Sequence, residues 1–155
     1  MSQTPSGPSL WLALFRTTEA MDRVARKSMS AAGLGFSDFV LLEALLHVGP
    51  LTPGALAEKV GLTSGSITAA LDRLELRGLV ERELNPDDQR SRIVMLTDTG
   101  RAVIEPAYEA HAADIERLFA STLTAEQRRD LFALLREVRK AARDETPPLR
   151  SERDD

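Results

Sequence analysis

One stretch of the chain places small and hydroxyl-bearing side chains, with a single cation, on what would be the outer face of a helix. We place the residues on a helical wheel with 100° between successive residues and with Ile67 facing the core. These side chains then lie opposite the core, on the flanks of the helix or at its first residues. They are Thr63, Ser64, Gly65, Ser66, Thr68, Ala69 and Arg73. Hydroxyls and helix-start N–H groups favour phosphates, small residues let a helix approach base edges, and an alanine methyl can contact thymine. The pattern therefore indicates a helix suited to contact with duplex DNA.

Arg73 is the cation of this face and our first choice for a contact with a phosphate or a guanine. A solvated ion pair of Arg73 with Asp72 or Glu75 is the alternative. DNA would repel Asp72 unless that carboxylate is paired, so we expect it to position an arginine. Thr63 and Ser64 have a second interpretation too, in which they only cap the helix.

A charged hairpin follows this helix. The strand-forming segments 79–84 and 92–97 flank the turn sequence Asn-Pro-Asp-Asp. Arg90 lies at the expected tip and Arg92 where the second strand would begin. Arginine is favoured in a narrow minor groove, where negative potential is concentrated, although any exposed turn carries charges.

The residues before the hairpin predict the helices that hold it. Thr52-Pro53 has the form of a helix start, and Gly61 can end that helix in a left-handed conformation. A second helix runs from its cap at Thr63 to Gly78. Two helices followed by a hairpin are the plan of a winged helix-turn-helix, whose second helix enters the major groove.

Longer helices are expected on both sides of this lobe. Ser9 caps a helix over residues 10–32, and a helix that begins at Ser37 is apolar nearly all round, as a buried central helix would be. After the hairpin a helix spans 98–120, with Pro106 expected to kink it. A capping box at Thr124 then starts the last helix.

The first helix and the last two have wider apolar stripes than one small domain can cover. Pairing with the same helices of a second copy would bury them and would place two recognition helices about one DNA turn apart on a palindromic operator. Packing of these helices within a monomer is the alternative. The expected division is a flexible N-terminus at 1–9, a dimerisation region at 10–35 and 98–144, a winged DNA-binding lobe at 36–97, and a flexible charged tail at 145–155.

Two motifs resemble the MarR family of dimeric bacterial transcription regulators: LTSGSITAALDRLELRGLVER at 62–82 and NPDDQRSRIVMLTDTG at 85–100. The second follows the wing pattern of the family through Asp88, Arg90, Leu96, Thr97 and Gly100. Many members carry Asp-Arg-Arg at the wing tip, where this chain has Asp88-Gln89-Arg90 and therefore one cation fewer. The resemblance spans residues 10–144. It implies a mainly α-helical winged helix-turn-helix with a two-stranded wing.

The resemblance also implies a small aromatic effector (an aromatic acid, phenol or quinone) between the dimerisation helices and the DNA-binding lobe. The residues that would line its pocket here are Trp11, Phe15, Phe39, Leu42, His47, Tyr108 and His111. Each aromatic residue among them has a simpler interpretation as part of the core. A ligand can release DNA only if it favours a dimer geometry in which the recognition helices are mis-spaced.

The two histidines give little indication of a metal site, because no clear cluster of His and carboxylate residues surrounds them. His47 fits a helix C-terminus, where the dipole favours a cation, and His111 lies three residues from Asp114 on one helix face. We therefore expect neither a metal nor a cofactor.

Composition excludes several classes of protein. The absence of Cys removes disulfides, thiolate zinc sites and thiol-based redox sensing. No apolar run approaches the ~20 residues that span a bilayer, and the N-terminus has no signal-peptide pattern, so we expect a cytoplasmic protein that does not bind membranes. We also expect no enzyme, since the sequence has no Gly-rich phosphate loop, nucleophile elbow or recognisable pair of catalytic carboxylates.

The net charge of −4 argues against DNA binding, and residues 61–96 hold five arginines against six acidic residues. DNA binding must therefore depend on the directions in which the arginine side chains point, and on a dimer that presents two copies of the DNA-binding surface. The sequence predicts a DNA-binding transcriptional regulator, a repressor that binds a palindromic operator as a homodimer and is released by an aromatic ligand. The alternative is a winged-helix dimer that binds protein or serves a structural role and does not bind DNA.

Overall fold

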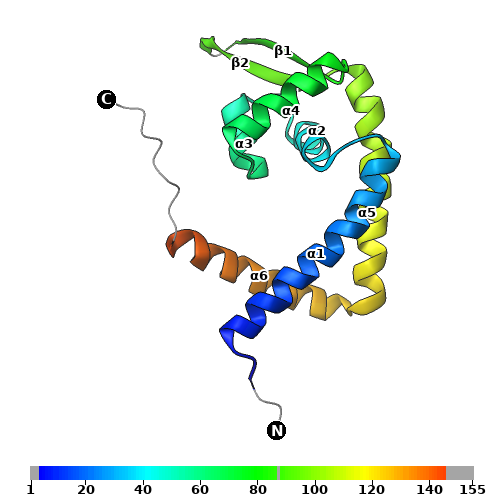
Figure 1. Ribbon diagram of the computed structural model, residues 1–155, viewed down its shortest axis with the longest axis vertical. Coiled ribbons are helices and arrows are strands. Elements are labelled where there is room, and N and C mark those ends of the chain that lie inside the picture. Colours follow the sequence, from blue (N-terminus) through cyan, green and yellow to red (C-terminus); the bar gives the residue numbers. More distant parts are fainter. Residues whose placement is uncertain (1–3, 87, 146–155) are drawn as a thin grey trace. The chain divides into compact units, whose positions relative to one another are not determined.

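A computed structural model describes residues 4–86 and 88–145, apart from the side chains of Ser64 and Gln89. The described part is mainly helical with a two-stranded sheet, as predicted (Figure 1). Its elements are α1 (Gly7–Ala31), α2 (Phe36–Val48), α3 (Pro53–Val60), α4 (Ser64–Leu76), β1 (Val80–Asn85), β2 (Asp88–Leu96), α5 (Asp98–Thr122) and α6 (Ala125–Glu145). The chain forms two compact units that divide between Ile115 and Glu116, within α5. Of the ends expected to be flexible, 1–9 and 145–155, residues 1–3 and 146–155 lie outside the described residues, whereas 7–9 belong to α1 and Glu145 to α6.

Side-chain caps set the starts of the short helices. The Thr52 side chain accepts from the Ala55 N–H at 3.2 Å, and Pro53 follows it in α3. Gly61 ends α3 with φ of 70°, in the left-handed region predicted for it. The prediction for α1 was wrong at its start, since Ser6 rather than Ser9 is the cap, and its side chain accepts from the Ser9 N–H.

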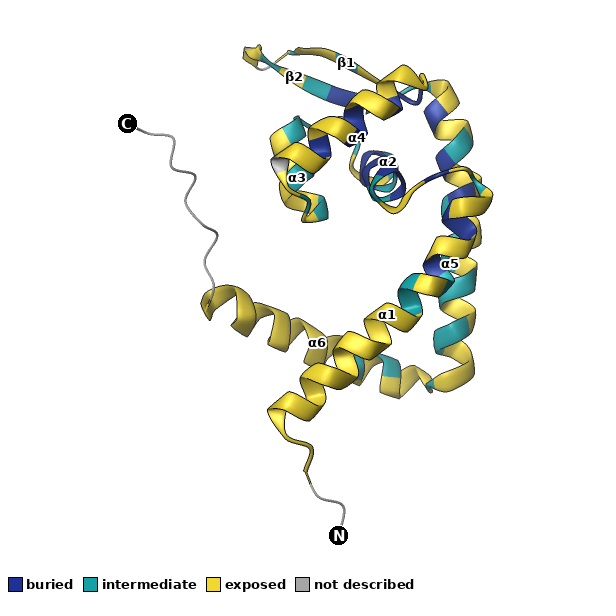
Figure 2. Ribbon diagram, in the orientation of Figure 1, coloured by how far each residue is buried: buried dark blue, intermediate teal, exposed yellow. Residues whose placement is uncertain are grey.

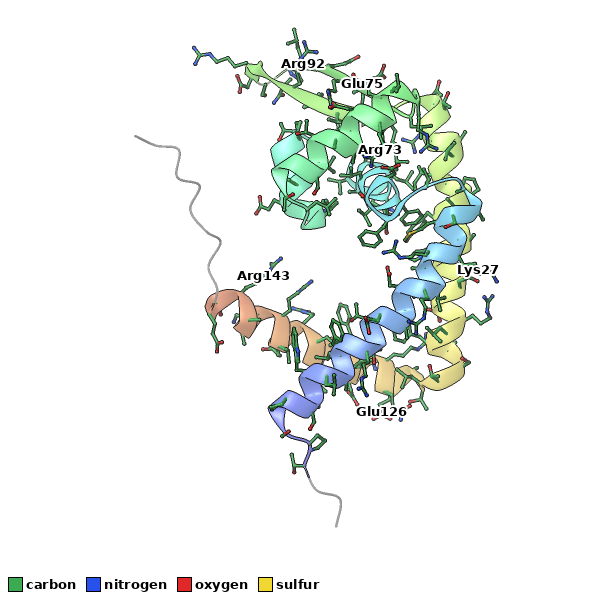
Figure 3. The ribbon with its side chains drawn as sticks, viewed as in Figure 1. Lys27, Arg73, Glu75, Arg92, Glu126 and Arg143 are labelled. Atoms are coloured by element: carbon green, nitrogen blue, oxygen red, sulfur yellow. The ribbon has the colours of Figure 1, made fainter. Side chains whose placement is uncertain are left out.

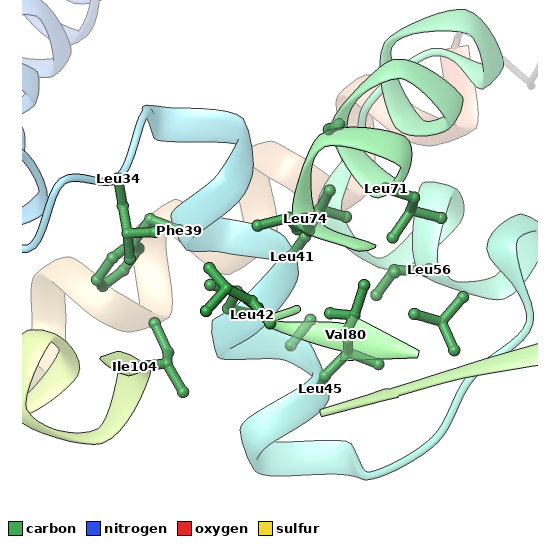
Figure 4. Packing of buried hydrophobic residues seen from close by; sticks show 14 of the residues in the cluster. Leu34, Phe39, Leu41, Leu42, Leu45, Leu56, Leu71, Leu74, Val80 and Ile104 are labelled. Carbon is green, nitrogen blue, oxygen red and sulfur yellow. The ribbon is translucent and has the colours of Figure 1, made fainter. Parts of the chain in front are cut away.

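The core of the first unit forms around α2, which is buried on most sides. Phe39, Leu41 and Leu42 have no exposed surface, and Leu45 is nearly as buried. Figure 4 shows these side chains among the buried residues of α3, α4, β1 and α5. Each fully buried leucine contributes about 1.5–3 kcal/mol. The nearly all-round apolar pattern therefore predicted a central helix correctly.

The apolar side of α4 is also the predicted one. Ile67, Ala70, Leu71 and Leu74 are all buried. Their burial against α2 and α3 fixes which residues of α4 face outward. The recognition helix is therefore oriented by packing rather than by its polar groups.

The wing is an antiparallel ribbon in which Val80 pairs with Leu96 and Leu84 pairs with Arg92. Asn85 pairs with Asp88 after a shift in register, so β2 begins at Asp88 and not at Arg92 as predicted. Strand pairing continues into the segment expected to be turn. Asp87, in the middle of that segment, lies outside the described residues.

Thr97 and Gly100 join the wing to α5. The Thr97 hydroxyl donates to the Gly78 carbonyl at 2.7 Å and accepts from the Gly100 N–H at 2.9 Å, as a cap does. A Cβ on Gly100 would lie 1.9 Å from the carbonyl oxygen of Leu79. Thr97 and Gly100 of the sequence motif therefore fix the start of α5 against the backbone of Gly78 and Leu79.

The second unit contains the end of α5 and all of α6. The predicted capping box forms, because the Thr124 N–H donates to Gln127 Oε1 at 2.9 Å and the Gln127 N–H donates to Thr124 Oγ1 at 3.2 Å. No residue of α6 is buried, and Phe132, Leu134 and Val138 are each more than half exposed. The N-terminal half of α1, in the first unit, is exposed as well, with Trp11 at 70% (Figure 2).

Among the described residues no single helix is long and apolar enough to cross a membrane. α1 and α2 pass such a test of length and composition only as a pair, bent by 78°, and six of the 13 residues of α2 are buried in the core.

Candidate nucleic-acid interface

The outward face of α4 carries most of the residues that the sequence nominated. Gly65, Ser66, Thr68, Ala69 and Arg73 are exposed, while the apolar residues between them are buried. A Cβ added to Gly65 would meet nothing within 4 Å, so the protein leaves open space beside this residue. Ser64 begins the helix, and its side chain lies outside the described part of the chain.

Thr63 is the cap of α4. Its Oγ1 accepts from the Ser66 N–H at 3.3 Å and lies 2.9 Å from Ser66 Oγ, to which it donates. In this arrangement the Ser66 hydroxyl can still donate to an outside acceptor. Capping and phosphate binding are therefore compatible at this helix start.

Two arginines, Arg73 within α4 and Arg77 at its end, share one carboxylate of α2. Arg73 Nη2 donates to Asp38 Oδ1 at 2.6 Å, and Arg77 Nη1 lies 3.5 Å from Asp38 Oδ2. Asp38 is a buried residue, while the arginine side chains remain 53% and 40% exposed. Arg77 also donates to the carbonyl oxygen of Gly33 at 3.1 Å. These contacts tie α4 to the start of α2, and Figure 3 shows Arg73 at this side of the recognition helix.

Neither Asp72 nor Glu75, the partners named in the alternative interpretation of Arg73, is therefore its partner. Asp38 lies 35 residues earlier in the chain, whereas the sequence offered Asp72 and Glu75 as near neighbours. Helical geometry turns Asp72 to the outer face, away from the flank where Arg73 meets α2.

The acidic residues of α4 have a different arginine. Arg82 of β1 contacts Asp72 Oδ1 at 2.6 Å and Glu75 Oε2 at 3.1 Å, so Asp72 does pair with an arginine, as expected. Arg82 is the most buried of the three arginines, with 23% of its side chain exposed. This contact joins the wing to the recognition helix and neutralises charges that would otherwise repel phosphates.

Arg90 and Arg92 are exposed on β2, and neither has an ion-pair partner among the residues described. The Arg90 N–H donates to Asp88 Oδ1 at 3.0 Å, which holds the backbone near the tip and leaves the guanidinium outside that contact. Figure 3 shows Arg92 on the wing. The unpaired cations of this surface thus lie on the wing, beside the exposed carboxylates of Glu81, Glu83 and Asp88.

A separate cavity of about 740 Å³ lies between α1, α2 and α5 within the first unit. Of the seven residues nominated for a ligand pocket, Phe15, Phe39 and His111 line it. His111 Nδ1 is 3.5 Å from Ser28 Oγ, and its ring meets Phe39 edge-on with centroids 5.1 Å apart.

The other four nominated residues are not brought to this cavity. Leu42 is fully buried in the core, and Trp11 lies in the exposed first half of α1. His47 and Tyr108 contact each other edge-on, with ring centroids 4.5 Å apart.

The lining also includes charged residues that the sequence did not single out: Glu19, Asp22, Arg26 and Glu43. Three of them follow Phe15 at intervals of four, three and four residues, which is the spacing of one helix face. This spacing could have identified these three residues from the sequence. Among the described residues no group of three His, Cys, Asp or Glu side chains is placed to hold a metal ion.

The fold and this surface define a winged helix-turn-helix protein flanked by long helices. The profile of the MarR family matches residues 32–91. The HTH-type transcriptional regulator MhqR of Bacillus subtilis is 30% identical over 124 residues, which are 80% of this chain and 85% of that protein. The chain belongs to the MarR family and is a transcriptional regulator of that family.

Solved structures agree with the fold. A mutant of MarR from E. coli, complexed with operator DNA, has a TM-score of 0.76 and 29% identity, covering 83% of this chain and 92% of that one. The PcaV transcriptional regulator from Streptomyces coelicolor, in complex with its natural ligand, has a TM-score of 0.75 and 25% identity over 92% of this chain and 99% of that one. The predicted family and fold class are confirmed.

Proposed function

We propose that this protein is a repressor that binds a palindromic operator as a homodimer and releases it when a small aromatic ligand binds. The observation that carries the proposal is the outer face of α4, small and hydroxyl-bearing, beside a wing whose Arg90 and Arg92 have no ion-pair partner among the described residues. α4 would read base edges through Gly65, Thr68 and Ala69. The wing arginines would enter the adjacent minor groove.

The internal pairing of charges on α4 supports this division of roles. Asp38 and Arg82 neutralise the helix, so its ion pairs leave little net charge to repel or attract phosphates. Nonspecific attraction would then come chiefly from the wing and from the N–H groups at the start of α4. A chain with net charge −4 can bind DNA if unpaired cations such as Arg90 and Arg92 lie where the duplex is contacted.

The dimer is supported by apolar surface that the single chain leaves uncovered. Residues 10–35 and 98–144 would form the dimerisation region, and 36–97 the DNA-binding lobe. Leu10, Trp11, Phe132 and Leu134 are each more than half exposed, which is unusual for side chains of this size in α1 and α6. Two-fold pairing would bury them and would present two copies of α4 to a palindrome. The related E. coli protein was crystallised with operator DNA.

Ligand relief is supported by the cavity between α1, α2 and α5. Its volume of about 740 Å³ lies within the range of small-molecule sites. The related PcaV protein was crystallised with its natural ligand. Because α2 also holds α4 through Asp38, a ligand against α2 has a route by which to shift the recognition helix.

The proposal is tested by selecting bound sequences from a random duplex library with the full chain, and by measuring its mass in solution. We expect a two-fold symmetric sequence, a dimeric mass, and affinity that falls steeply as salt rises. Selection of no preferred sequence at low salt would contradict operator binding. A monomer at the concentrations where DNA is bound would contradict the dimer.

A winged-helix dimer that binds protein and not DNA is the second candidate, and the net charge of −4 favours it. Binding to heparin or random duplex at low salt separates the two. Phosphate contacts must produce retention that is lost as salt rises, whereas a protein-binding module gives none.

A further inference from the structure

The cavity between α1, α2 and α5 has a mostly apolar and aromatic lining. The side chains that provide it include Phe15, Met21, Met29, Phe36, Phe39 and Ile115. Three of these are phenylalanines, one from α1 and two from the first turns of α2. A flat or globular aromatic molecule of drug size would fit this volume and composition.

The charges in the lining are not balanced. Arg26 and Asp22 compensate each other, since Arg26 Nε donates to Asp22 Oδ2 at 2.6 Å. Glu19 on α1 and Glu43 on α2 also line the cavity, and neither has an ion pair or hydrogen bond to another described side chain. Two acidic residues, exposed Glu19 and half-buried Glu43, therefore line a largely apolar space without an ion pair to another described side chain.

Arg26, in the lining of the cavity, shows how an aromatic ring and a carboxylate bind a cation there. The Arg26 guanidinium carbon lies 5.8 Å from the centroid of the Phe36 ring while its Nε is bound to Asp22. An aromatic face and a carboxylate together stabilise a cation, because the ring quadrupole and the negative charge act in the same direction. Glu19 and Glu43, with the exposed ring of Phe15, offer the same pair of groups to a ligand.

We propose that the ligand of this cavity is a lipophilic aromatic cation. The proposal rests on the proposed function in so far as the cavity is its effector site, and it adds the charge of the effector. An aromatic acid, one of the classes implied by the family resemblance, would bring a further carboxylate beside Glu19 and Glu43. A cation of equal size would replace that repulsion by two attractions in a partly desolvated site.

The test compares two probes of the same shape and opposite charge, tetraphenylphosphonium and tetraphenylborate, by isothermal titration calorimetry with the full chain. We expect the phosphonium to bind and the borate to bind at least tenfold more weakly. Glu19→Gln and Glu43→Gln keep the size of each side chain and remove its charge. Each should weaken phosphonium binding about three- to tenfold and strengthen borate binding.

Glu109→Gln is the matched control, because Glu109 is exposed on α5 and does not line the cavity. It should leave both affinities unchanged. Urea unfolding of each variant shows whether the fold is retained. Loss of a carboxylate that only supports the fold would weaken both probes together, not shift them in opposite directions.

Equal affinity for the two probes, tighter binding of the borate, no binding of the phosphonium, or Gln variants that behave like Glu109→Gln would each overturn the proposal. DNA binding is measured separately, by gel shift without any probe. A protein that fails to bind DNA but prefers the phosphonium contradicts the proposed function alone. A protein that binds DNA and prefers the borate contradicts only the cationic ligand.

Discussion

Arg73 Nη2 and Asp38 Oδ1 lie 2.6 Å apart, which joins the recognition helix α4 to the first turn of α2 through a buried carboxylate. Arg77 shares the same carboxylate. The most obvious cation of the outer face of α4 therefore has a structural partner. Its contribution to DNA binding includes holding the helix in place as well as any contact of its own.

We expect Asp38→Asn to destabilise the protein by about 2 kcal/mol, because it leaves two arginines without their shared carboxylate. The value stays below that of a fully buried pair, since both guanidinium groups can turn toward water. Urea unfolding measures the change. Asp22→Asn removes a more exposed ion pair with Arg26 and should cost less than about 1 kcal/mol. Equal losses in the two variants would contradict a special role for Asp38.

We expect Arg90→Ala to weaken operator binding without changing stability, because no ion pair of Arg90 is present among the described residues. The slope of log affinity against log salt should fall by about 1 if Arg90 neutralises one phosphate. Gel shifts over a salt series give this slope. Arg139→Ala, an exposed substitution on α6, should leave it unchanged.

Arg73→Ala should also weaken operator binding without unfolding the dimer, but it should lower the unfolding midpoint, which Arg90→Ala does not. The difference arises because Asp38 keeps only the 3.5 Å contact with Arg77. Unchanged DNA affinity in both arginine variants would contradict the assignment of these residues to the interface.

Gly65→Ala tests how closely α4 approaches DNA. The added methyl meets nothing within 4 Å in the protein, and alanine favours helix, so stability should not fall. Affinity for the operator should fall about tenfold, ~1.4 kcal/mol, if the helix packs against base edges at this point. Gly35→Ala, also in open space, is the matched control. Retention of full affinity by Gly65→Ala would show that this end of α4 lies away from the bases.

Gly100→Ala should destabilise the protein by about 3 kcal/mol, because its Cβ would lie 1.9 Å from the Leu79 carbonyl oxygen. The backbone on both sides must then shift. Thermal unfolding measures the loss. Gly54→Ala places a methyl in open space on α3 and should change stability by less than about 0.5 kcal/mol.

Much of the fold follows from neighbouring residues and could be predicted. The cap at Thr63, the end of α3 at Gly61 and the capping box at Thr124 each depend on groups a few positions apart. A predicted helix boundary was wrong where two residues could both act as the cap. Ser6 and Ser9 are both serines near the start of the same apolar stripe, and Ser6 is the cap. The predicted start of β2 was wrong because its pairing with β1 extends into residues that usually form turns.

The sequence by itself determined which residues of α4 face outward, because helical periodicity and the burial of Ile67 and Leu74 are local consequences of residue type. It did not determine which charges meet. Arg73 pairs with Asp38 and Asp72 pairs with Arg82, across 35 and 10 positions, while Glu19 and Glu43 come to one cavity from different helices. Electrostatic partners depend on distance in space, and only the packing of α1, α2, α4 and the wing decides that distance.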